Sequence, residues 1–506
     1  MSENLSLLLS GFGNALRLEN LVFAFAGCFL GTLVGMLPGL GPSAAIAILL
    51  PITAAMDPTA AIVMLAAIYY GCQYGDTITA VLFNTPGTGG AAMTAVEGHM
   101  MAKQGRAGTA LAIAAIASFV GGTVTVGLLA MIALPLTSLA LSFGPPEFFA
   151  LIVLSLALVV TLGSSSTLRG LITTVFGLIL AMVGTDPVMG LPRLTFGQMH
   201  LLDGVAFIPV IIGLFGVGEI LKNLEDPTNS FREAVVSKLR ITRDDARRSA
   251  PAIARGTVLG FLIGIIPGMG TIPAAFMSYV TEKRLSRTPE RFGTGMIEGV
   301  AGPESANNAA ANGALLPLLT LGIPGSGVVA ILMGALMMNG IVPGPLMFEE
   351  QSDLVWTLIA SMYVGNVILL VLNLPFIPMW VSILRIPYSF LFPVILGFTI
   401  VGAYSLANSQ FDLGLIAVFG LIGYIMRKLD FPLVPIIMTL ILGPMMEGGL
   451  RRSLEMSQGD FTIFLQRPIT AGFLTLAVVF LLLPLMSGVR RRLKRASTPV
   501  SPGETD

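Results

Sequence analysis

Four short segments rich in Pro and Gly interrupt otherwise apolar stretches of this 506-residue chain, and they are its best candidates for binding chemistry. Pro and Gly break helices, and a broken helix exposes backbone N–H and C=O groups. Free N–H groups at the start of a half-helix attract anions, whereas free carbonyl groups suit Na⁺. The four segments are residues 38–41, 85–89, 267–270 and 323–327.

Hydroxyl and amide side chains lie in or beside these segments and add donors to the backbone groups. We therefore predict a substrate site that needs no Arg or Lys. The alternative is that the segments only allow tight helix packing, which we favour for Gly31, Gly35, Gly260 and Gly264. The predicted site residues are Pro38, Gly39, Gly41, Ser43, Asn84, Thr85, Pro86, Gly87, Thr88, Pro267, Gly268, Gly270, Thr271, Pro324, Gly325 and Ser326.

Carboxyl and amide groups at membrane depth form a second set of candidates. A carboxylate is costly to place in lipid, so it usually faces a cavity or a partner. Asp76 precedes the second segment, and Glu304, Asn307 and Asn308 precede the fourth. We expect these four residues either to line the site or bind a cation, or simply to bond to neighbouring backbone.

Motifs for enzymatic catalysis are missing from the sequence. It has no Gly-rich loop ending in Lys-Ser or Lys-Thr, and no evident nucleophile–base pair. Its two His and two Cys are isolated, so we expect no metal site and no cofactor, and we interpret Cys28 and Cys72 as small apolar residues. The formal net charge of zero gives no indication of nucleic-acid binding. We therefore predict that the protein is not an enzyme.

The elements that must position these residues are membrane helices. Hydrophobic residues make up 54% of the chain and charged residues 11%, against about 25% charged in a soluble domain. A helix needs about 20 apolar residues to cross the hydrocarbon core. Such segments lie near 107–140, 147–163, 170–184, 205–221, 354–384, 387–407, 410–426, 431–446 and 468–487.

The distribution of charge predicts a topology. The polar stretch 222–255 contains eight basic residues, so the positive-inside rule places it in the cytoplasm, together with the basic tail 490–506. Only Arg193, Arg451 and Arg452 sit against the rule. Residues 256–280 have basic flanks on both sides and a central Pro-Gly break, and each arm has only ten to twelve residues. We therefore predict a re-entrant hairpin here that enters and leaves on the cytoplasmic side.

An internal repeat relates the two halves. Gly31, Gly35, Pro38, Gly39 and Gly41 match residues 229 positions later, and residues 85–89 match residues 323–327 at an offset of 238. The charge count makes the two copies run in opposite directions. We thus predict an all-α polytopic membrane protein with about 10–12 transmembrane segments and two inverted repeats, each with a re-entrant Pro-Gly hairpin and a broken helix. The predicted units are residues 1–221, a linker 222–255, residues 256–489 and the tail 490–506.

The motifs resemble one family. The sequences of residues 35–42, 84–88, 101–108, 302–308 and 319–326 are similar to those of the large permease subunit of tripartite tricarboxylate transporters, the TctA family. The resemblance covers nearly the whole chain. It departs at Asp76, where a second glycine is expected after Tyr74-Gly75, so no particular carboxylate is assigned.

The resemblance implies cation-driven uptake, by Na⁺ or H⁺, of a carboxylate across the inner membrane of a bacterium. It also implies two partners, a small four-helix membrane subunit (TctB-like) and a periplasmic solute-binding protein (TctC-like). Two alternatives stay open at this point. One is a stand-alone carrier or channel without partners, and the other is a membrane scaffold or receptor without flux.

Overall fold

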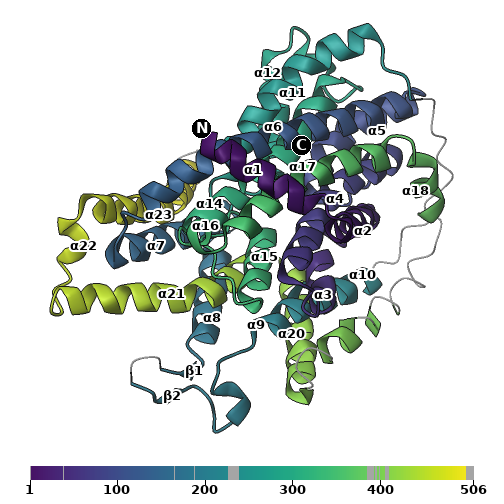
Figure 1. The fold of residues 1–506 in the computed structure, drawn as a ribbon. Helices are drawn as coiled ribbons and strands as arrows, with labels where there is room; N and C mark the ends of the chain where they lie inside the picture. The colour runs from purple at the N-terminus through teal and green to yellow at the C-terminus, as the bar shows by residue number, and fades with distance from the viewer. Residues whose placement is uncertain are drawn as a thin grey trace.

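The chain folds almost entirely into helices in the computed structural model (Figure 1). The only strand pairing among the described residues is between β1 (Gly184–Thr185) and β2 (Pro192–Arg193), which run antiparallel. The structure describes residues 2–37, 39–163, 166–186, 189–225, 239–384, 393, 396–397, 399–404 and 409–496. Pro38, most of the segment predicted near 387–407, part of the linker and the end of the tail therefore lie outside the described residues.

The first half builds a helix pair, a long buried helix and a break. Its elements are α1 (Ser2–Ala15), α2 (Leu18–Gly35), α3 (Pro42–Thr53), α4 (Pro58–Phe83), η1 (Gly89–Ala91), α5 (Ala92–Lys103) and α6 (Ala107–Ala140). Asp57 begins α4 by accepting a hydrogen bond from the Thr59 N–H at 2.9 Å. Asn84 ends the helix in the left-handed conformation, with φ of 55°.

The second half repeats this order. Its elements are α11 (Arg243–Gly264), α12 (Thr271–Leu285), η4 (Pro289–Arg291), α13 (Glu298–Gly313), α14 (Leu315–Leu321), α15 (Gly327–Met338), α16 (Met347–Glu350) and α17 (Ser352–Asn373). Gly322, 238 positions after Asn84, ends α14 in the same left-handed conformation, with φ of 71°. The chain therefore leaves the buried helix in the same way in both halves.

The remaining elements flank these two units. They are α7 (Pro145–Leu162), α8 (Thr167–Ala181), η2 (Met199–Leu201), α9 (Phe207–Ile211), the π-helical η3 (Ile212–Val217), α10 (Gly218–Glu225), α18 (Ile377–Ile383), α20 (Gln410–Lys428), α21 (Val434–Met456), α22 (Ile463–Gln466) and α23 (Pro468–Ala496). Figure 1 shows α7, α21, α22 and α23 together on one side of the molecule, and the α11–α12 pair at one end.

The core is built on α4 and α13. Every residue of α4 from Ala60 to Leu82 is buried, and so is every residue of α13 from Gly299 to Gly313. Both helices carry polar residues at buried positions, which lowers their hydropathy. For this reason neither helix stands out as a simple apolar segment in the sequence, although both are more central than the segments that do.

Close backbone packing explains the glycines ahead of the breaks. A Cβ added at Gly31 would meet the backbone of Ile68, and one at Gly260 would meet the backbone of Ala306. Ile68 and Ala306 are 238 positions apart. Gly35 lies against Cys72 and Gly264 against Ala310, and these two partners are also 238 positions apart. The packing interpretation of these four glycines is confirmed, and the same helix contact recurs in each half.

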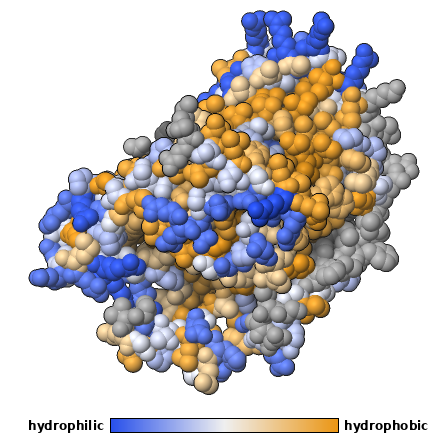
Figure 2. All heavy atoms as spheres, viewed as in Figure 1, coloured by the Kyte–Doolittle hydropathy of each residue, from blue (hydrophilic) through white to orange (hydrophobic). Residues whose placement is uncertain are grey.

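Seven helices of the described residues are long and apolar enough to cross a membrane, and five shorter apolar ones accompany them. The chain is therefore a multi-pass membrane protein, as predicted. One boundary was wrong: the segment predicted at 354–384 is two helices, because α17 ends at Asn373 ahead of Pro375 and α18 starts at Ile377. Figure 2 shows apolar side chains over much of the visible face, with hydrophilic ones at the upper tip, at the left end and across the middle.

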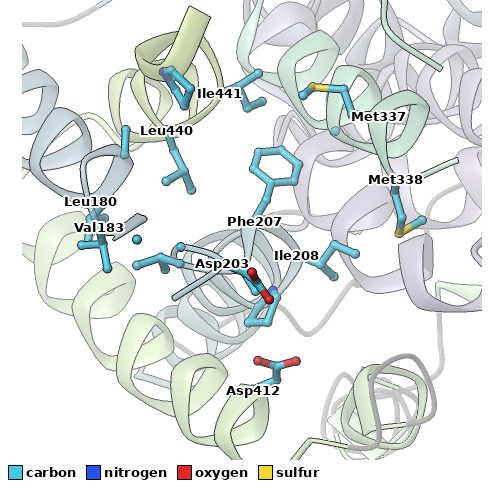
Figure 3. A pocket seen from close by; sticks show the side chains of 18 of the residues that line it. Leu180, Val183, Asp203, Phe207, Ile208, Met337, Met338, Asp412, Leu440 and Ile441 are labelled. Atoms are coloured by element: carbon cyan, nitrogen blue, oxygen red, sulfur yellow. The ribbon is translucent and has the colours of Figure 1, made fainter. Parts of the chain in front are cut away.

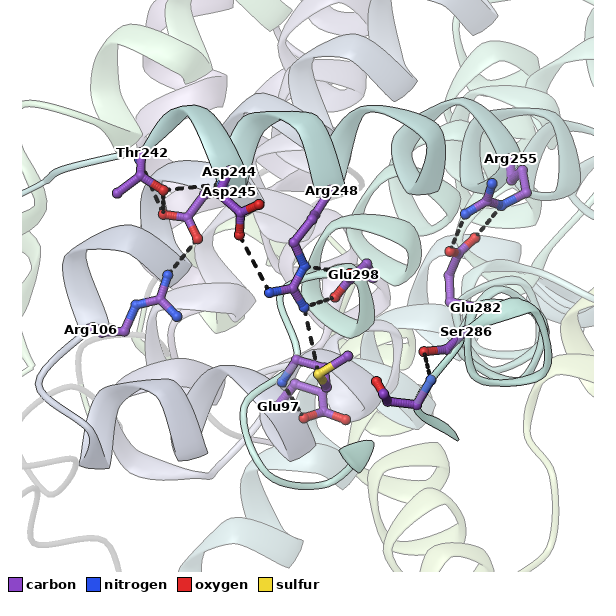
Figure 4. A network of polar contacts seen from close by, with 12 residues as sticks. Glu97, Arg106, Thr242, Asp244, Asp245, Arg248, Arg255, Glu282, Ser286 and Glu298 are labelled. Atoms are coloured by element: carbon purple, nitrogen blue, oxygen red, sulfur yellow. Dashed lines mark hydrogen bonds and ion pairs between the residues drawn. The ribbon is translucent and has the colours of Figure 1, made fainter. Parts of the chain in front are cut away.

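The pair α11–α12 forms a hairpin closed by an ion pair. Arg255 Nε lies 2.8 Å from Glu282 Oε1, and Glu282 is buried (Figure 4). The arms are longer than the ten to twelve residues expected, at 22 and 15 residues. The difference arises because α11 begins in the charged stretch at Arg243, before its apolar part. A hairpin joined across its arms agrees with the predicted return of the chain to one side.

Candidate functional site

The two helix breaks have matching local geometry. At the first break the Thr85 N–H donates to the Thr79 carbonyl at 3.3 Å, and at the second the Ile323 N–H donates to the Pro317 carbonyl at 3.2 Å. In each case the next helix is capped by a hydroxyl. Thr88 Oγ1 accepts from the Gly90 N–H at 3.2 Å, and Ser326 Oγ accepts from the Val329 N–H at 3.3 Å. The backbone bonds are equivalent in sequence, whereas the two hydroxyls, although at equivalent positions, accept from N–H groups two and three residues later.

Each break packs against the hairpin of its own half. The Gly268 N–H donates to the Gly325 carbonyl at 3.0 Å. A Cβ added at Gly87 would collide with the Gly35 carbonyl, and one at Gly325 would lie 2.7 Å from Ala314 Cα. These two glycines are therefore required for packing within their own half. This is a different reason from the close approach of a ligand that the sequence suggested.

Side chains also reach from each half into the break of the other. The amide of Asn307, on α13, abuts the backbone of Gly90 at the first break. The Tyr69 hydroxyl, on α4, reaches the side chain of Ser326 at the second break. Residues 69 and 307 are also 238 positions apart. The two breaks are thus tied together by a reciprocal exchange of side chains between α4 and α13.

A buried acidic cluster lies at the first break. We call the set Asp76, Thr77, Thr88, Glu304 and Asn307 the acidic cluster. The Thr77 hydroxyl donates to Asp76 Oδ1 at 3.3 Å, and the Thr88 hydroxyl donates to Asp76 Oδ2. Asp76, Glu304 and Asn307 are fully buried. The two carboxyl groups interact electrostatically across the boundary between α4 and α13.

Hydroxyl side chains also lie around the Glu304 carboxyl group. The Ser118 hydroxyl, from α6, donates to Glu304 Oε2 at 3.1 Å. The Thr77 and Thr94 side chains lie beside the same carboxyl group. Three of the four predicted polar residues therefore meet in one place. The fourth, Asn308, turns to its own helix and donates to the Glu304 carbonyl at 3.2 Å.

The other predicted residues lie at the hairpin ends. Gly39 and Gly268 adopt φ of 87° and 85°, so the two tips turn in the same way. Gly39 lies against the Asn223 side chain of α10, whereas a Cβ at Gly41 would meet open space. Ser43 and Thr271 lie in the first turns of α3 and α12, and a Cβ at Gly270 would lie 3.7 Å from Ser326 Cβ. Thr85, Pro86 and Pro324 lie in the two breaks, and Pro267 lies in the tip between α11 and α12.

A cavity of about 900 Å³ lies elsewhere in the described part of the chain (Figure 3). Its wall comes from α8, α9, α15, α20 and α21, with Phe207, Met337, Met338 and Leu440 among the apolar side chains and Asp203 and Asp412 beside them. The sequence did not point to it, because its residues come from segments far apart in the chain. It contacts the C-terminal half of α15, away from the Ser326 end.

Charged residues near this cavity explain two departures from the positive-inside rule. Arg193 Nη1 lies 2.8 Å from Glu447 Oε1, and Arg451 Nη2 lies 2.8 Å from Asp186 Oδ2. Arg451 also lies 2.7 Å from Glu447. Two arginines and two carboxylates thus neutralise each other, so these arginines are structural and carry little weight for topology.

A network of ion pairs ties α5 and α6 to the α11–α12 hairpin (Figure 4). Arg106 Nη2 lies 2.5 Å from Asp245 Oδ1, and Arg248 Nε lies 2.7 Å from Glu298 Oε1. Burial opposes ionisation of Asp245, but the hydrogen bonds from Thr242 and Arg106 outweigh it and hold the pKa of that carboxyl below its ordinary value. The two halves are therefore also joined at the face where the basic residues gather.

Glu97 forms the most heavily bonded carboxylate of this network. It is fully buried and accepts from the Tyr279 hydroxyl at 2.9 Å and from the Gly295 and Met296 N–H groups at 2.8 Å. These bonds fix the loop between α12 and α13 against α5. Nothing in the local sequence indicates this role, because the partners of Glu97 are the Tyr279 hydroxyl and backbone groups almost 200 positions away.

Comparison with known proteins agrees with this architecture. The profile of the family described as "Tripartite tricarboxylate transporter TctA family" matches residues 21–438. The chain belongs to the TctA family. The family resemblance stated from the motifs is thereby confirmed. Members of this family form the large subunit of tripartite transporters, so the chain is a transporter permease by family.

Two relatives of this TctA-family chain come from Agrobacterium vitis. The protein described as "Uncharacterized 52.8 kDa protein in TAR-I ttuC' 3'region" is 47% identical over 493 residues, which cover 97% of each chain. The protein described as "Uncharacterized protein in TAR-II ttuC' 3'region" is 47% identical over 233 residues, which cover 46% of this chain and 96% of that one. No solved structure matches.

Proposed function

We propose that this chain is the membrane-spanning permease of a binding-protein-dependent secondary transporter that imports a carboxylate with a cation, Na⁺ or H⁺. Family membership supplies the transporter class. The observation that carries the proposal is the pair of matching helix breaks, each held against a hairpin tip and each touched by the other half. Broken helices at a repeat interface are a common way to build a transport site.

The carboxylate would bind to the backbone N–H groups and hydroxyls of the breaks and hairpin tips, as the sequence predicts. Within that site the second break suits an anion better than the first, because Ser326 and the N-terminus of α15 lie there. Free N–H groups and the helix dipole attract negative charge. The acidic cluster at the first break repels it. Gly41 and Gly270 lie at the two hairpin ends, and a Cβ added at either position would meet few neighbouring atoms.

Cation coupling follows from the charge of the substrate. Import of an anion into a cell with a negative interior costs about 2.3 kcal/mol per charge per 100 mV. The proposal places residues 222–255 and 490–506 in the cytoplasm, makes the two repeats inverted, and assigns the protein to a bacterial inner membrane. Its partners would be the small four-helix membrane subunit and a periplasmic solute-binding protein.

Uptake by cells tests the proposal against its two alternatives. Cells would carry this chain together with a TctB-like small subunit and a TctC-like binding protein, and would receive a panel of radiolabelled tri-, di- and aromatic carboxylates. We expect uptake of at least one acid that stops when any component is left out or when the Na⁺ and H⁺ gradients are collapsed. Uptake without the partners would favour a stand-alone carrier. A lack of flux for every acid that the binding protein retains would favour a receptor.

Cysteine labelling tests the topology. Single cysteines at Ser237, Ser286 and Ser501 should all resist impermeant thiol reagents in intact cells and react in inverted vesicles. This result is expected because all three positions lie in basic segments. Labelling of Ser286→Cys but not of Ser237→Cys in intact cells would contradict the re-entrant hairpin.

A further inference from the structure

The acidic cluster has two carboxyl groups and no cationic partner among the described residues. Asp76 bonds to Thr77 and Thr88, and Glu304 bonds to Ser118. By contrast, the other buried carboxylates near it are paired or saturated: Glu282 with Arg255, and Glu97 with three backbone N–H groups and a hydroxyl. A buried carboxylate without a counter-charge is costly, so two of them facing each other need positive charge, either from protons or from a bound cation.

Unsatisfied oxygen atoms point to what supplies that charge. Glu304 Oε1 has no hydrogen-bond partner, and neither atom of the Asn307 amide has one. Gln73 Oε1, one turn before Asp76 on α4, is also unpartnered. Thr94 Oγ1 has no partner at normal hydrogen-bond geometry, but it lies beside the Glu304 carboxyl, so a small shift would join these two groups. All four side chains are at most 1% exposed. Buried polar groups are almost always satisfied in native proteins, so this concentration indicates a ligand.

The space beside the cluster is small. A cavity of about 10 Å³ is lined by Thr77 and Ser118, which bond to the two carboxyl groups, and otherwise by Tyr74, Ile78, Leu111, Ala115 and Asn373, so the other four cluster residues do not line it. This volume is close to that of one water-sized sphere, about 10–15 Å³. The region therefore leaves no room for an organic molecule, and an ion held by the cluster would lie between the cluster's own oxygen atoms and not in this cavity.

We infer that Asp76, Glu304 and Asn307, with the hydroxyl of Thr88, bind one Na⁺ ion at the first helix break. Hard cations take several oxygen ligands, and the cluster offers carboxylate, amide and hydroxyl oxygens from both halves of the protein. A proton would leave the amide and the surplus oxygens unexplained, because the two carboxyl groups are not bonded to each other.

This site would make the ion part of the contact between the two halves. Asp76 and Thr88 come from the first half, and Glu304 and Asn307 from the second, one helical turn apart on α13. Bound Na⁺ would thus hold α13 against the first break, and its release would leave like charges facing each other. The inference rests on the proposed function for the role of this ion as the coupling ion, but Na⁺ binding itself can be measured alone.

Binding of ²²Na⁺ to the purified full-length chain in nanodiscs tests the site without a substrate or a partner. We expect saturable binding that falls by at least about tenfold in affinity in Asp76→Asn, Glu304→Gln and Asn307→Ala, and by about tenfold in Thr88→Val. Glu349→Gln, an exposed carboxylate on α16, is the matched control and should bind as the wild type does. Size-exclusion profiles identify any variant that fails to fold.

Three results would overturn the inference. They are the absence of saturable ²²Na⁺ binding to the wild type, unchanged affinity in Asp76→Asn and Glu304→Gln, and displacement of Na⁺ by Ca²⁺ at concentrations far below that of Na⁺. The first would assign the site to a proton and the last to a divalent ion. Na⁺ binding that depends on the cluster, combined with no carboxylate uptake in the cell assay, would leave the site standing and remove the proposed function.

Discussion

The two helix breaks share a backbone but differ in chemistry. Thr88 and Ser326 occupy equivalent positions, and each hydroxyl caps the helix that follows it, Thr88 through the N–H two residues later and Ser326 through the N–H three residues later. At the first break Asp76 lies beside Thr88, whereas Ala314 takes the equivalent position at the second. The first break also has exposed residues, Asn84 and Gly89, whereas the second is buried from Gly322 to Ser326. Repetition thus accounts for the scaffold, and divergence of a few side chains separates a proposed cation site from a proposed anion site.

The largest effect expected is a loss of stability, and it should be of similar size for a substitution in the first half and for the equivalent substitution in the second. Gly87→Val and Gly325→Val each place side-chain atoms in the backbone of their own half, Gly35 and Ala314 respectively. We expect each to lower the stability by about 3 kcal/mol or more and to reduce the yield of monodisperse protein. Gly41→Ala is the control, because its Cβ meets open space. Thermal unfolding of the purified variants measures the effect, and a wild-type midpoint for either valine variant would show that the packing differs.

The next largest effect should be confined to the first break. Asp76→Asn and Glu304→Gln remove one charge each from the acidic cluster, whereas no carboxylate of this kind lies at Ser326. We expect gradient-driven carboxylate uptake to fall by about tenfold to 100-fold in both variants, since hydrogen bonds to charged groups contribute about 1.5–3 kcal/mol. Uptake assays with matched expression levels provide the measurement. Wild-type Na⁺ dependence in either variant would remove the cation site from the first break.

A smaller effect on stability is expected from the ion pair that the second hairpin has and the first lacks. Arg255 and Glu282 close the second hairpin, while the equivalent positions of the first, 229 residues earlier, are Ala26 and Thr53. Arg255→Gln should destabilise the protein by about 1–2 kcal/mol, because it leaves the buried Glu282 carboxylate without its partner. The double variant Arg255→Gln/Glu282→Gln should recover part of this loss. A single variant as stable as the wild type would show that the ion pair does not hold the hairpin.

The sequence predicted the repeated parts well because backbone geometry leaves a residue-type signal. Gly and Pro must stand where a helix breaks or two backbones touch, and their offsets of 229 and 238 predicted which positions are equivalent. The membrane class followed from composition for a similar reason, since lipid contact requires apolar surface.

The parts that could not be predicted depend on contacts between distant segments. The meeting of Asp76 with Glu304 joins residues more than 200 positions apart, and nothing in either local sequence indicates the partner. The same holds for Asn307 against Gly90 and for the cavity beside α15. The ion pairs of Arg193 and Arg451 could not be predicted from the sequence either. The positive-inside rule therefore treated these two residues as exceptions, although acidic partners neutralise them in the fold.

The most direct test of the account compares one chemical change at two equivalent positions. Thr88→Ala and Ser326→Ala each delete a single capping hydroxyl, worth about 1 kcal/mol, or about fivefold in affinity. Transport is measured with Na⁺ varied at saturating carboxylate and with carboxylate varied at saturating Na⁺. The account predicts that Thr88→Ala raises only the half-saturating Na⁺ concentration and that Ser326→Ala raises only the KM for the carboxylate. Equal shifts of the same constant in both variants would contradict the division of cation and anion between the two breaks.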